Sequence, residues 1–490
     1  MNLFRFLRLL PVLPLFAAGA SAREATDKPN VIIVFVDDSG YGDYSHTGNP
    51  VVNTANLTRM VNEGANFPQF YCGSAACSAS RYAILTGRHP GRSGLGAWVI
   101  GPESERYISP KEITIADGLK RLGYATAIFG KWHLGTPNAK NRFTPDALPL
   151  AHGFDRWIGT NVSADYAKGL DLIRSDASGT APAKGYSIVK HDFASDVPVQ
   201  ESLTKLYGDN AVAFIRENKD KPFFLYVTPN QPHLPVHASA EFKGRTPRGE
   251  YGDAIEEIDA QIGRIRDTLR ETGIEKNTLI VFSSDNGPWI RFDKTKQHPM
   301  YGEARLKVGS ALPFRDGKGS DWEGGVRVPG IMCWPGVIPA ATVVREPAST
   351  LDLLPTVFAL AGAPVPADRK IDGRDIRHYL DPVHVAATPA PFEYYYPDNR
   401  NLPVAVRVGP WKLMEQAFSQ TSDTYGFKAS AKTPLLFQVE HDFSERLDVA
   451  AERPGVVRDL KKRLDERRTA IVKDGSFWGA AKADNPDTDE

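Results

Sequence analysis

Residues 31–38 read VIIVFVDD, a run of six apolar residues that ends in two adjacent carboxylates. Six apolar, mostly β-branched residues in succession predict a strand that is buried on both faces of a sheet. The segments 125–129, 223–228 and 278–283 have the same character, and each leads into polar residues. Residues 255–269 carry isoleucine or leucine at every third or fourth position, which predicts an amphipathic helix. Strands alternating with helices predict an α/β fold, with a large mixed and mostly parallel sheet flanked by helices.

The polar residues that follow these four strands point to one shared site. They are Asp37 and Asp38, Lys131 and His133, His233, and Asp285 and Asn286. Because ligands of open α/β sheets bind beyond the carboxyl ends of the strands, all of these side chains are expected at one edge of the sheet. Three carboxylates and one amide oxygen suit a hard cation, calcium or magnesium, better than zinc. Taken alone, each acidic segment is also explained by a solvated turn.

The character of the sequence changes near residue 385. Beyond it, the segments 394–396, 404–408 and 435–439 read as short strands, and residues 455–472 read as a helix with one apolar face. The chain is therefore predicted to consist of an α/β domain over residues 23–385, a smaller α+β domain over residues 386–475 and a polar tail over residues 476–490.

The first 22 residues are predicted to be a secretory signal peptide. Arg5 and Arg8 precede an apolar stretch over residues 9–18, and Ala20-Ser21-Ala22 suits cleavage near Ala22. A membrane anchor is the alternative, but the apolar stretch is short and contains two prolines. We therefore expect an exported protein without a stable membrane anchor, located in the periplasm or outside the cell. The 59 basic and 59 acidic residues balance, so no bulk charge indicates a nucleic-acid partner.

Cys77 is one of only three cysteines, with Cys72 and Cys333. Small residues on both sides of Cys77 lead into a helical stretch, which places Cys77 near a helix N-terminus where negative charge is favoured. Arg81 lies four residues later and would share its helix face. Two other interpretations stay open on this ground alone: a buried structural cysteine, and a disulfide between Cys72 and Cys77.

The residues around Cys77 resemble the signature of the sulfatase family. That signature is similar to CSASR at 77–81 followed by ILTGR at 84–88, and a second family motif resembles GYATAIFGKWH at 123–133. Further segments resemble the family in the same order along the chain: Pro232-His233, DNG at 285–287, Gly317-Lys318, EGGVRVP at 323–329, LDLLPT at 351–356 and VRVGPWKL at 406–413. The resemblance is to formylglycine-dependent (type I) sulfatases, in particular the group of arylsulfatase A and N-acetylgalactosamine-6-sulfatase. It implies the alkaline-phosphatase-like form of the α/β fold.

The resemblance also implies a reaction and a role for each site residue. The reaction is hydrolysis of an aryl or carbohydrate sulfate monoester to an alcohol and inorganic sulfate. By resemblance, Asp37, Asp38, Asp285 and Asn286 match the metal ligands, usually for calcium, and Cys77 supplies a further ligand oxygen once a maturase converts it to formylglycine (3-oxoalanine). Arg81 matches the residue that holds the formylglycine, Lys131, His233 and Lys318 match the groups that bind sulfate oxygens, and His133 matches the partner of the formylglycine hydroxyl.

The proton transfers follow from the resemblance together with the chemistry of the reaction. Asp285 is expected to help deprotonate the attacking hydroxyl, His233 to protonate the leaving oxygen and His133 to assist the second deprotonation. Ala79 stands where the family usually has proline, which leaves open which maturase acts on Cys77. Phe129 replaces a smaller family residue and is expected to adjust packing only.

Two other functions compete with sulfate ester hydrolysis. A phosphate or phosphonate ester hydrolase could use the same fold and the same metal-binding edge. A non-catalytic binder of sulfated glycans could use the same pocket with Cys77 unconverted. For the substrate, the basic loop over residues 288–316 either steers a polyanionic glycan or is an ordinary solvated surface loop. Residues 160–199 are expected to border the pocket and to help set specificity.

Overall fold

The computed structural model describes residues 28–474 except for several internal segments. The segments outside the described part are 1–27, 94–98, 105, 137–144, 167, 176–184, 291–306, 398–401, 417–433 and 475–490. The predicted signal peptide, the polar tail and most of the basic loop therefore lie outside the described residues. No helix in the part that the structure describes is long and apolar enough to cross a membrane.

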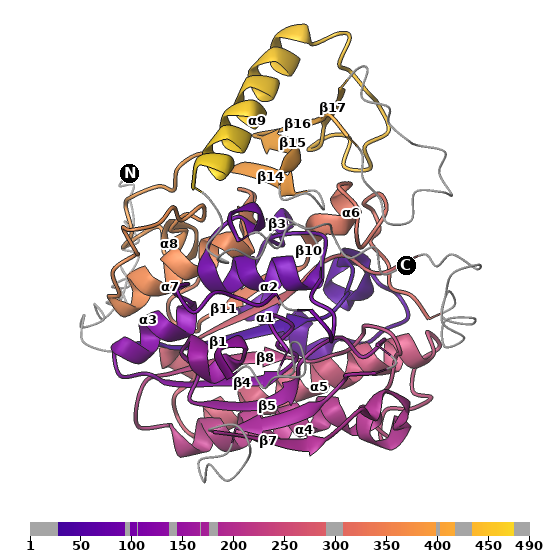
Figure 1. The fold of residues 1–490 in the computed structure, drawn as a ribbon, viewed down its shortest axis with the longest axis vertical. Helices are drawn as coiled ribbons and strands as arrows, with labels where there is room; N and C mark the ends of the chain where they lie inside the picture. The colour runs from indigo at the N-terminus through magenta and orange to yellow at the C-terminus, as the bar shows by residue number, and fades with distance from the viewer. Residues whose placement is uncertain are drawn as a thin grey trace, which may run out of the picture.

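The four strands predicted from their apolar runs form the centre of a ten-stranded sheet (Figure 1). They are β1 (Asn30–Val36), β4 (Ala125–Gly130), β8 (Phe223–Thr228) and β9 (Thr278–Ser284). In the sheet they run parallel to one another in the order β9-β1-β8-β4. Their carboxyl ends therefore meet at one edge, as the sequence predicts.

The strands on either side make the sheet mixed. β5 (Arg156–Thr160) continues the parallel set beside β4, and antiparallel strands then follow on both flanks. Beyond β5, the strands β6 (Leu172–Ser175) and β7 (Tyr186–Lys190) each pair antiparallel to the strand before them. Beyond β9, the strands β11 (Gly330–Cys333) and β2 (Ala65–Asn66) also pair antiparallel. The short β12 (Thr342–Val343) ends this flank and pairs parallel to β2. The predicted fold, a mixed and mostly parallel sheet flanked by helices, is confirmed.

Alternate residues of β1 pack against different helices, which explains why this strand is apolar throughout. Val31, Ile33 and Phe35 belong to one core, with α2 (Cys77–Thr86), α3 (Ile115–Arg121) and α7 (Leu353–Ala361). Ile32, Val34 and Val36 belong to a second core, with α1 (Ala55–Glu63), α4 (Val197–Glu217) and α5 (Glu250–Glu271). Both faces of the sheet are thus covered by helices.

A second, smaller sheet follows near the C-terminus (Figure 1, orange and yellow). β14 (Glu393–Pro397), β15 (Pro403–Val408), β16 (Trp411–Met414) and β17 (Leu435–Gln438) form an antiparallel sheet in sequence order. The long helix α9 (Pro454–Asp474) packs Leu460 and Leu464 against Val406 and Leu413 of this sheet. This arrangement fits the predicted α+β region, to which the structure adds the strand β16.

A three-stranded sheet and two short helices complete the fold around the site. The strands are β3 (Phe70–Tyr71), β10 (Arg327–Val328) and β13 (Ala348–Ser349), in the order β10-β3-β13. The helices are α6 (Glu323–Val326), directly before β10, and α8 (Arg377–Leu380). Because β3 lies shortly before Cys77 and β10 shortly after Lys318, their pairing brings these two distant parts of the chain together.

Candidate active site

The residues predicted to form one site converge at the carboxyl ends of the central strands. Asp37 and Asp38 follow β1, Lys131 and His133 follow β4, His233 lies in the loop after β8, and Asp285 and Asn286 follow β9. All of these side chains are buried. Asp38 and His133 have positive φ angles of 62° and 55°, a backbone conformation that is uncommon for residues other than glycine. Such strained positions concentrate at functional sites.

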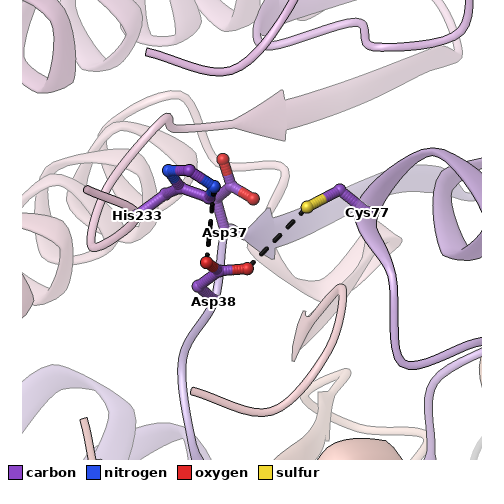
Figure 2. Close-up of side chains that lie close together, drawn as sticks. All are labelled: Asp37, Asp38, Cys77 and His233. Atoms are coloured by element: carbon purple, nitrogen blue, oxygen red, sulfur yellow. Dashed lines mark hydrogen bonds and ion pairs between the residues drawn. The ribbon is translucent and has the colours of Figure 1, made fainter. Parts of the chain in front are cut away.

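Cys77 is the first residue of α2 and is fully buried, as expected for a residue near a helix N-terminus. Figure 2 shows its thiol directed toward the loop that follows β1, with Sγ 3.7 Å from Asp38 Oδ1. Cys72, Cys77 and Cys333 are all free thiols, so a disulfide between Cys72 and Cys77 is excluded. Burial raises the pKa of the Cys77 thiol well above its ordinary value. In this environment, Cys77 is a neutral thiol rather than a reactive thiolate.

Three cations are interleaved with the three carboxylates of the site. Arg81 Nη2 lies 2.7 Å from Asp285 Oδ2 and 3.5 Å from Asp37 Oδ1. Lys131 Nζ lies 2.7 Å from Asp37 Oδ2, and Lys318 Nζ lies 2.9 Å from Asp38 Oδ2. Burial acts to raise the pKa of Asp37, but the positive charges of its neighbours, led by Lys131, hold that pKa well below its ordinary value. The Asp37 carboxylate is therefore ionised although it is buried.

Asp285 lies between Arg81 and the backbone of the Asp38 loop. Its Oδ2 accepts a hydrogen bond from Arg81, and its Oδ1 accepts one of 3.1 Å from the backbone N–H of Asp38. Burial and the nearby charge of Asp37 raise the pKa of Asp285 to about 7, although Arg81 acts in the opposite direction. A carboxyl group with such a pKa can exchange a proton near neutral pH.

The two histidines differ in how their ring nitrogens are bound. His133 Nε2 lies 3.0 Å from the carbonyl oxygen of Ile100 and must donate to it, while Nδ1 is buried without a hydrogen-bond partner among the described residues. Burial and the neighbouring cations lower the pKa of His133 well below its ordinary value, so its imidazole is neutral. In His233, Nδ1 donates to the carbonyl of Leu234, and Nε2 faces Asp38 Oδ2 at 3.4 Å (Figure 2).

The donor atoms of the site fit a metal ion. Asp37, Asp38, Cys77 and His233 each offer a ligand atom, and these atoms all lie within 4.8 Å of one another (Figure 2). Asn286 lies beside them, because its Nδ2 donates to Asp38 Oδ1 at 2.7 Å. Two buried oxygens, Asp37 Oδ1 and Asn286 Oδ1, have no hydrogen-bond partner among the described residues. Buried acceptors left without donors are the groups that a hard cation would satisfy.

This cluster differs in one respect from the ligand set that the family resemblance implies. It includes His233, whereas the Asp285 carboxylate is turned toward Arg81 and the backbone N–H of Asp38. Asp285 nevertheless shares the site, because its charge acts on the pKa of Cys77. The Asp285 carboxylate is thus held in place by hydrogen bonds that do not depend on a metal.

The structure adds residues that sequence reasoning did not identify. Ser163 Oγ lies 2.6 Å from Lys131 Nζ, and Trp289 packs against both His233 and Lys318. Ser163 falls within residues 160–199, which were expected to border the pocket, but its sequence neighbourhood gives no sign of the contact. Trp289 could have been noticed, since it follows the DNG segment by two residues.

Comparison with known proteins identifies relatives that match most of the chain. The Sulfatase family model matches residues 29–363. The N-acetylgalactosamine-6-sulfatase of Rattus norvegicus is 34% identical over 466 residues, which cover 89% of this chain and 84% of the relative. An arylsulfatase of Hemicentrotus pulcherrimus is 33% identical over 473 residues, covering 91% of this chain and 82% of the relative. The crystal structure of the PsFucS1 sulfatase from Pseudoalteromonas sp. matches with a TM-score of 0.76 and 26% identity, covering 91% of each chain.

Proposed function

The chain belongs to the sulfatase family and is a sulfuric ester hydrolase, and on this premise we propose that it acts through an aldehyde made from Cys77. The observation that supports this most directly is the position of Cys77. It lies buried at the start of α2, among three cations and three carboxylates, with a thiol that is neutral rather than nucleophilic. A neutral thiol is poorly suited to attack sulfur itself.

Conversion of Cys77 to an aldehyde would replace the neutral thiol with a group that can supply the nucleophile. A maturase with an external two-electron oxidant would oxidise the thiol to a thioaldehyde, and addition of water would release the sulfur as hydrogen sulfide and leave the aldehyde. The hydrated aldehyde would supply two hydroxyl groups on one carbon, one to attack the sulfate sulfur and one whose deprotonation lets sulfate leave by C–O cleavage. Ala79, two residues after Cys77, leaves open which maturase acts here.

The surrounding side chains are suited to hold the sulfate group and to move protons. Lys131 and Lys318 would bind the sulfate oxygens and offset the negative charge that they share. In its imidazolium form, in which Nδ1 keeps its hydrogen bond to the carbonyl of Leu234, His233 would donate the Nε2 proton to the leaving oxygen. Asp285, whose pKa is raised to about 7 by burial and Asp37, would accept the proton of the attacking hydroxyl. His133 would accept the second proton on Nδ1, the ring nitrogen without a hydrogen-bond partner.

We assign calcium to the metal site, with magnesium as the alternative. Asp37, Asp38, Asp285 and Asn286 would hold the ion together with an oxygen made from Cys77, and these oxygen ligands suit a hard cation. When bound, the ion would neutralise charge that develops on the sulfate and nucleophile oxygens. Ca²⁺ should bind to the wild-type enzyme in a calorimetric titration and should raise its melting temperature. An Asp38→Asn variant should lose both the binding and the increase in melting temperature.

Mass spectrometry of the Cys77 peptide tests the proposal directly. Material from a host with a maturase should carry an aldehyde in place of the thiol and hydrolyse sulfate esters. Cys77→Ser should retain at most trace turnover unless the maturase also accepts serine. Cys333→Ala is a matched control, because this buried free thiol lies in β11, outside the site. Full activity of a protein with an intact Cys77 thiol would exclude an aldehyde as the source of the nucleophile. An intact thiol in native material without activity would instead favour a protein that binds sulfated glycans without hydrolysing them.

The substrate is proposed to be a sulfated carbohydrate or aryl compound, and the protein is proposed to be exported. N-acetylgalactosamine-6-sulfatase is among the relatives, which makes sulfated amino sugars the first compounds to assay. Comparing kcat/KM for matched sulfate and phosphate monoesters distinguishes a sulfatase from a phosphate or phosphonate ester hydrolase. A higher kcat/KM for the sulfate ester is expected, and a preference for phosphate would reverse the assignment. Export is tested by locating the mature N-terminus, expected near Arg23.

A further inference from the structure

The loop after β1 holds Asp38 in an uncommon backbone conformation by hydrogen bonds to successive residues. The φ angle of Asp38 is 62°, which is unfavourable for a residue with a side chain. The backbone N–H groups of Asp38, Ser39 and Gly40 each donate to a side chain. In that order, the acceptors are Asp285 Oδ1 at 3.1 Å, Ser284 Oγ at 2.9 Å and Asp43 Oδ2 at 2.7 Å. A strained conformation persists only where such contacts over-determine it, so these bonds fix the direction of the Asp38 carboxylate.

Asp43 differs from the other two acceptors, because it lies neither at the end of β9 nor in the candidate active site. It is 1% exposed and ends a short helical turn over Tyr41–Asp43. Its Oδ2 also accepts a hydrogen bond of 2.7 Å from the hydroxyl of Tyr251 in α5. Its Oδ1 accepts one of 2.7 Å from the backbone N–H of Ser310. One buried carboxylate therefore joins the Asp38 loop to α5 and to the segment that leads to Lys318.

Tyr251 and the segment around Ser310 leave this carboxylate no room to move. The Tyr251 hydroxyl is buried between Asp43 and the Asp38 loop, and it lies 3.4 Å from the carbonyl oxygen of Asp38. Gly309 packs directly on the pair, since a Cβ atom there would overlap the Tyr251 hydroxyl and lie 2.5 Å from Asp43 Oδ2. Asp43 and Tyr251 thus contact the backbone on both sides of the Asp38 side chain, and neither touches its carboxylate.

We propose that Asp43 and Tyr251 are positioning residues that aim the Asp38 carboxylate at the metal ion, which deepens the proposed function and rests on it. Neither is placed to bind the ion itself, because both oxygens of Asp43 accept hydrogen bonds and the Tyr251 hydroxyl is bonded to one of them. Groups that orient a metal ligand in this way change metal affinity without touching the metal. Their loss lets the backbone at Asp38 relax toward a less strained conformation and turns a ligand away.

The test compares Asp43→Asn with the wild type, both checked for conversion of Cys77. The amide keeps the shape of the carboxylate but presents an NH₂ group to N–H donors, so Gly40 or Ser310 loses its acceptor. We expect the Kd for Ca²⁺ in a calorimetric titration to rise about 10- to 100-fold. Excess Ca²⁺ should restore most of the activity, because all ligands are still present. Tyr251→Phe removes one hydroxyl and should raise the Kd about three- to tenfold.

Asp259→Asn is the matched control. Asp259 is a buried carboxylate of α5 that accepts from the backbone N–H groups of Asn56 at 3.1 Å and Leu57 at 2.8 Å, at the start of α1. Its replacement should lower the melting temperature and leave the Kd for Ca²⁺ unchanged.

The proposal is overturned if Asp43→Asn and Tyr251→Phe behave like this control, with lower melting temperatures and wild-type affinity for Ca²⁺. If Asp43→Asn does not fold, Tyr251→Phe alone decides between the two results. A failure of the proposed metal site is distinguishable, because in that case the wild-type enzyme itself would bind neither Ca²⁺ nor Mg²⁺.

Discussion

At the scale of single residues, His133 is held so that one ring nitrogen stays available. Nε2 donates to the carbonyl of Ile100, which fixes the tautomer, and the buried Nδ1 has no hydrogen-bond partner among the described residues. Because burial and cations lower its pKa, the ring stays neutral and can accept a proton. We predict that His133→Ala lowers kcat about 10²- to 10⁴-fold, the usual contribution of a positioned acid or base. Inhibition by inorganic sulfate should change far less.

His89 provides the control for this prediction. It is also buried, its pKa is lowered to about 4 by burial, and its Nε2 is bound to the carbonyl of Tyr395. Both ring nitrogens of His89 have partners, since Nδ1 accepts from the backbone N–H of Gly91. His89→Ala should therefore lower the melting temperature without lowering kcat in the folded fraction. Steady-state kinetics at matched temperature compare the two, and a similar kcat for His133→Ala and the wild type would contradict the role of His133.

The scale of single elements shows what could be predicted from the sequence and what could not. The four central strands and their polar ends were predictable because the signal is local: an apolar run and the residues directly after it. The two-residue strands β3, β10 and β13 are too short to carry a periodic pattern. The contact of Lys412 with the carbonyl of Asp321, 91 residues away, depends on how the two sheets pack. The contacts of Trp289 with His233 and Lys318 join loops that lie far apart in the sequence, so the sequence shows only the position of Trp289 after the DNG segment and not its partners.

The loop after β9 packs against α6 with no space for a side chain. A Cβ atom on Gly287 would lie 1.8 Å from the carbonyl oxygen of Gly324, and the Gly287 N–H donates to the carbonyl of Gly325 at 2.9 Å. Because the obstacle is backbone, one of the two segments must move. We predict that Gly287→Ala lowers the free energy of unfolding by about 1–3 kcal/mol. It should also weaken Ca²⁺ binding, since Asn286 is the preceding residue.

Denaturant unfolding and calorimetry of Ca²⁺ binding measure these two effects. Gly455 is the matched control, because a Cβ there meets nothing closer than 3.9 Å, the side chain of Arg458. Gly455→Ala, near the start of α9, should leave stability and Ca²⁺ affinity close to those of the wild type. If Gly287→Ala behaved like Gly455→Ala, the close packing of the loop against α6 would have no energetic consequence.

At the scale of the whole molecule, partly buried ion pairs join the C-terminal helix to the α/β core. Asp372 accepts from Arg92 at 2.7 and 2.9 Å and pairs with Arg467 of α9 at 2.5 Å. Burial acts to raise the pKa of Asp372, but the two arginines lower it to about 2. A carboxyl whose folded pKa lies below its unfolded value stabilises the protein above the unfolded pKa. That stabilisation is lost as the pH falls from about 4 to about 2.

We therefore predict that the destabilisation caused by Asp372→Asn depends on pH. At neutral pH, the variant should lose several kcal/mol, because Arg92 is left buried with one partner fewer. As the pH falls below about 4, the gap to the wild type should narrow, by about 1 kcal/mol at pH 3 and by about 2 kcal/mol near pH 2. Unfolding in urea at pH 7 and near pH 3 measures this change. Asp368→Asn, which removes an exposed partner of Arg369, should have little effect at either pH, and a gap for Asp372→Asn that does not vary with pH would contradict the assignment.

The C-terminal sheet also contacts the segment that carries Lys318, defined here as residues 315–326. Lys412 of β16 lies 2.6 Å from Glu445 Oε1 and 3.2 Å from Glu323 Oε1, and its Nζ donates to the carbonyl of Asp321 at 2.6 Å. The Glu323 N–H donates in turn to Glu445 Oε2 at 2.7 Å. On the side of the active site, Gly319 of the same segment donates to the carbonyl of Ala75, two residues before Cys77. Residues 315–326 are thus held from one side by Lys412 of the C-terminal sheet and by Glu445, and from the other side by the loop before Cys77.

We predict that Lys412→Met acts on sulfate binding through Lys318, with Lys412 as a positioning residue. Its loss leaves Glu323 and Glu445 without their shared cation, so the segment should shift and Lys318 should bind sulfate oxygens less well. KM for a sulfate ester and the inhibition constant of inorganic sulfate should both rise about tenfold. Arg468→Met is the control, because Arg468 pairs with Glu415 and Asp465 and donates to the carbonyl of Pro403, all inside the C-terminal region. It should lower stability without changing sulfate inhibition.

A double-mutant cycle separates this effect from a general loss of structure. If Lys412 acts through Lys318, then Lys412→Met should cost much less affinity for sulfate in a Lys318→Ala background than in the wild type, because the affected interaction is already gone. Additive losses would show that Lys412 stabilises the fold without positioning Lys318. The coupled result would mean that the C-terminal sheet forms part of the sulfate site although it supplies none of the proposed sulfate-binding side chains. Truncation of that region would then be expected to remove sulfate binding together with stability.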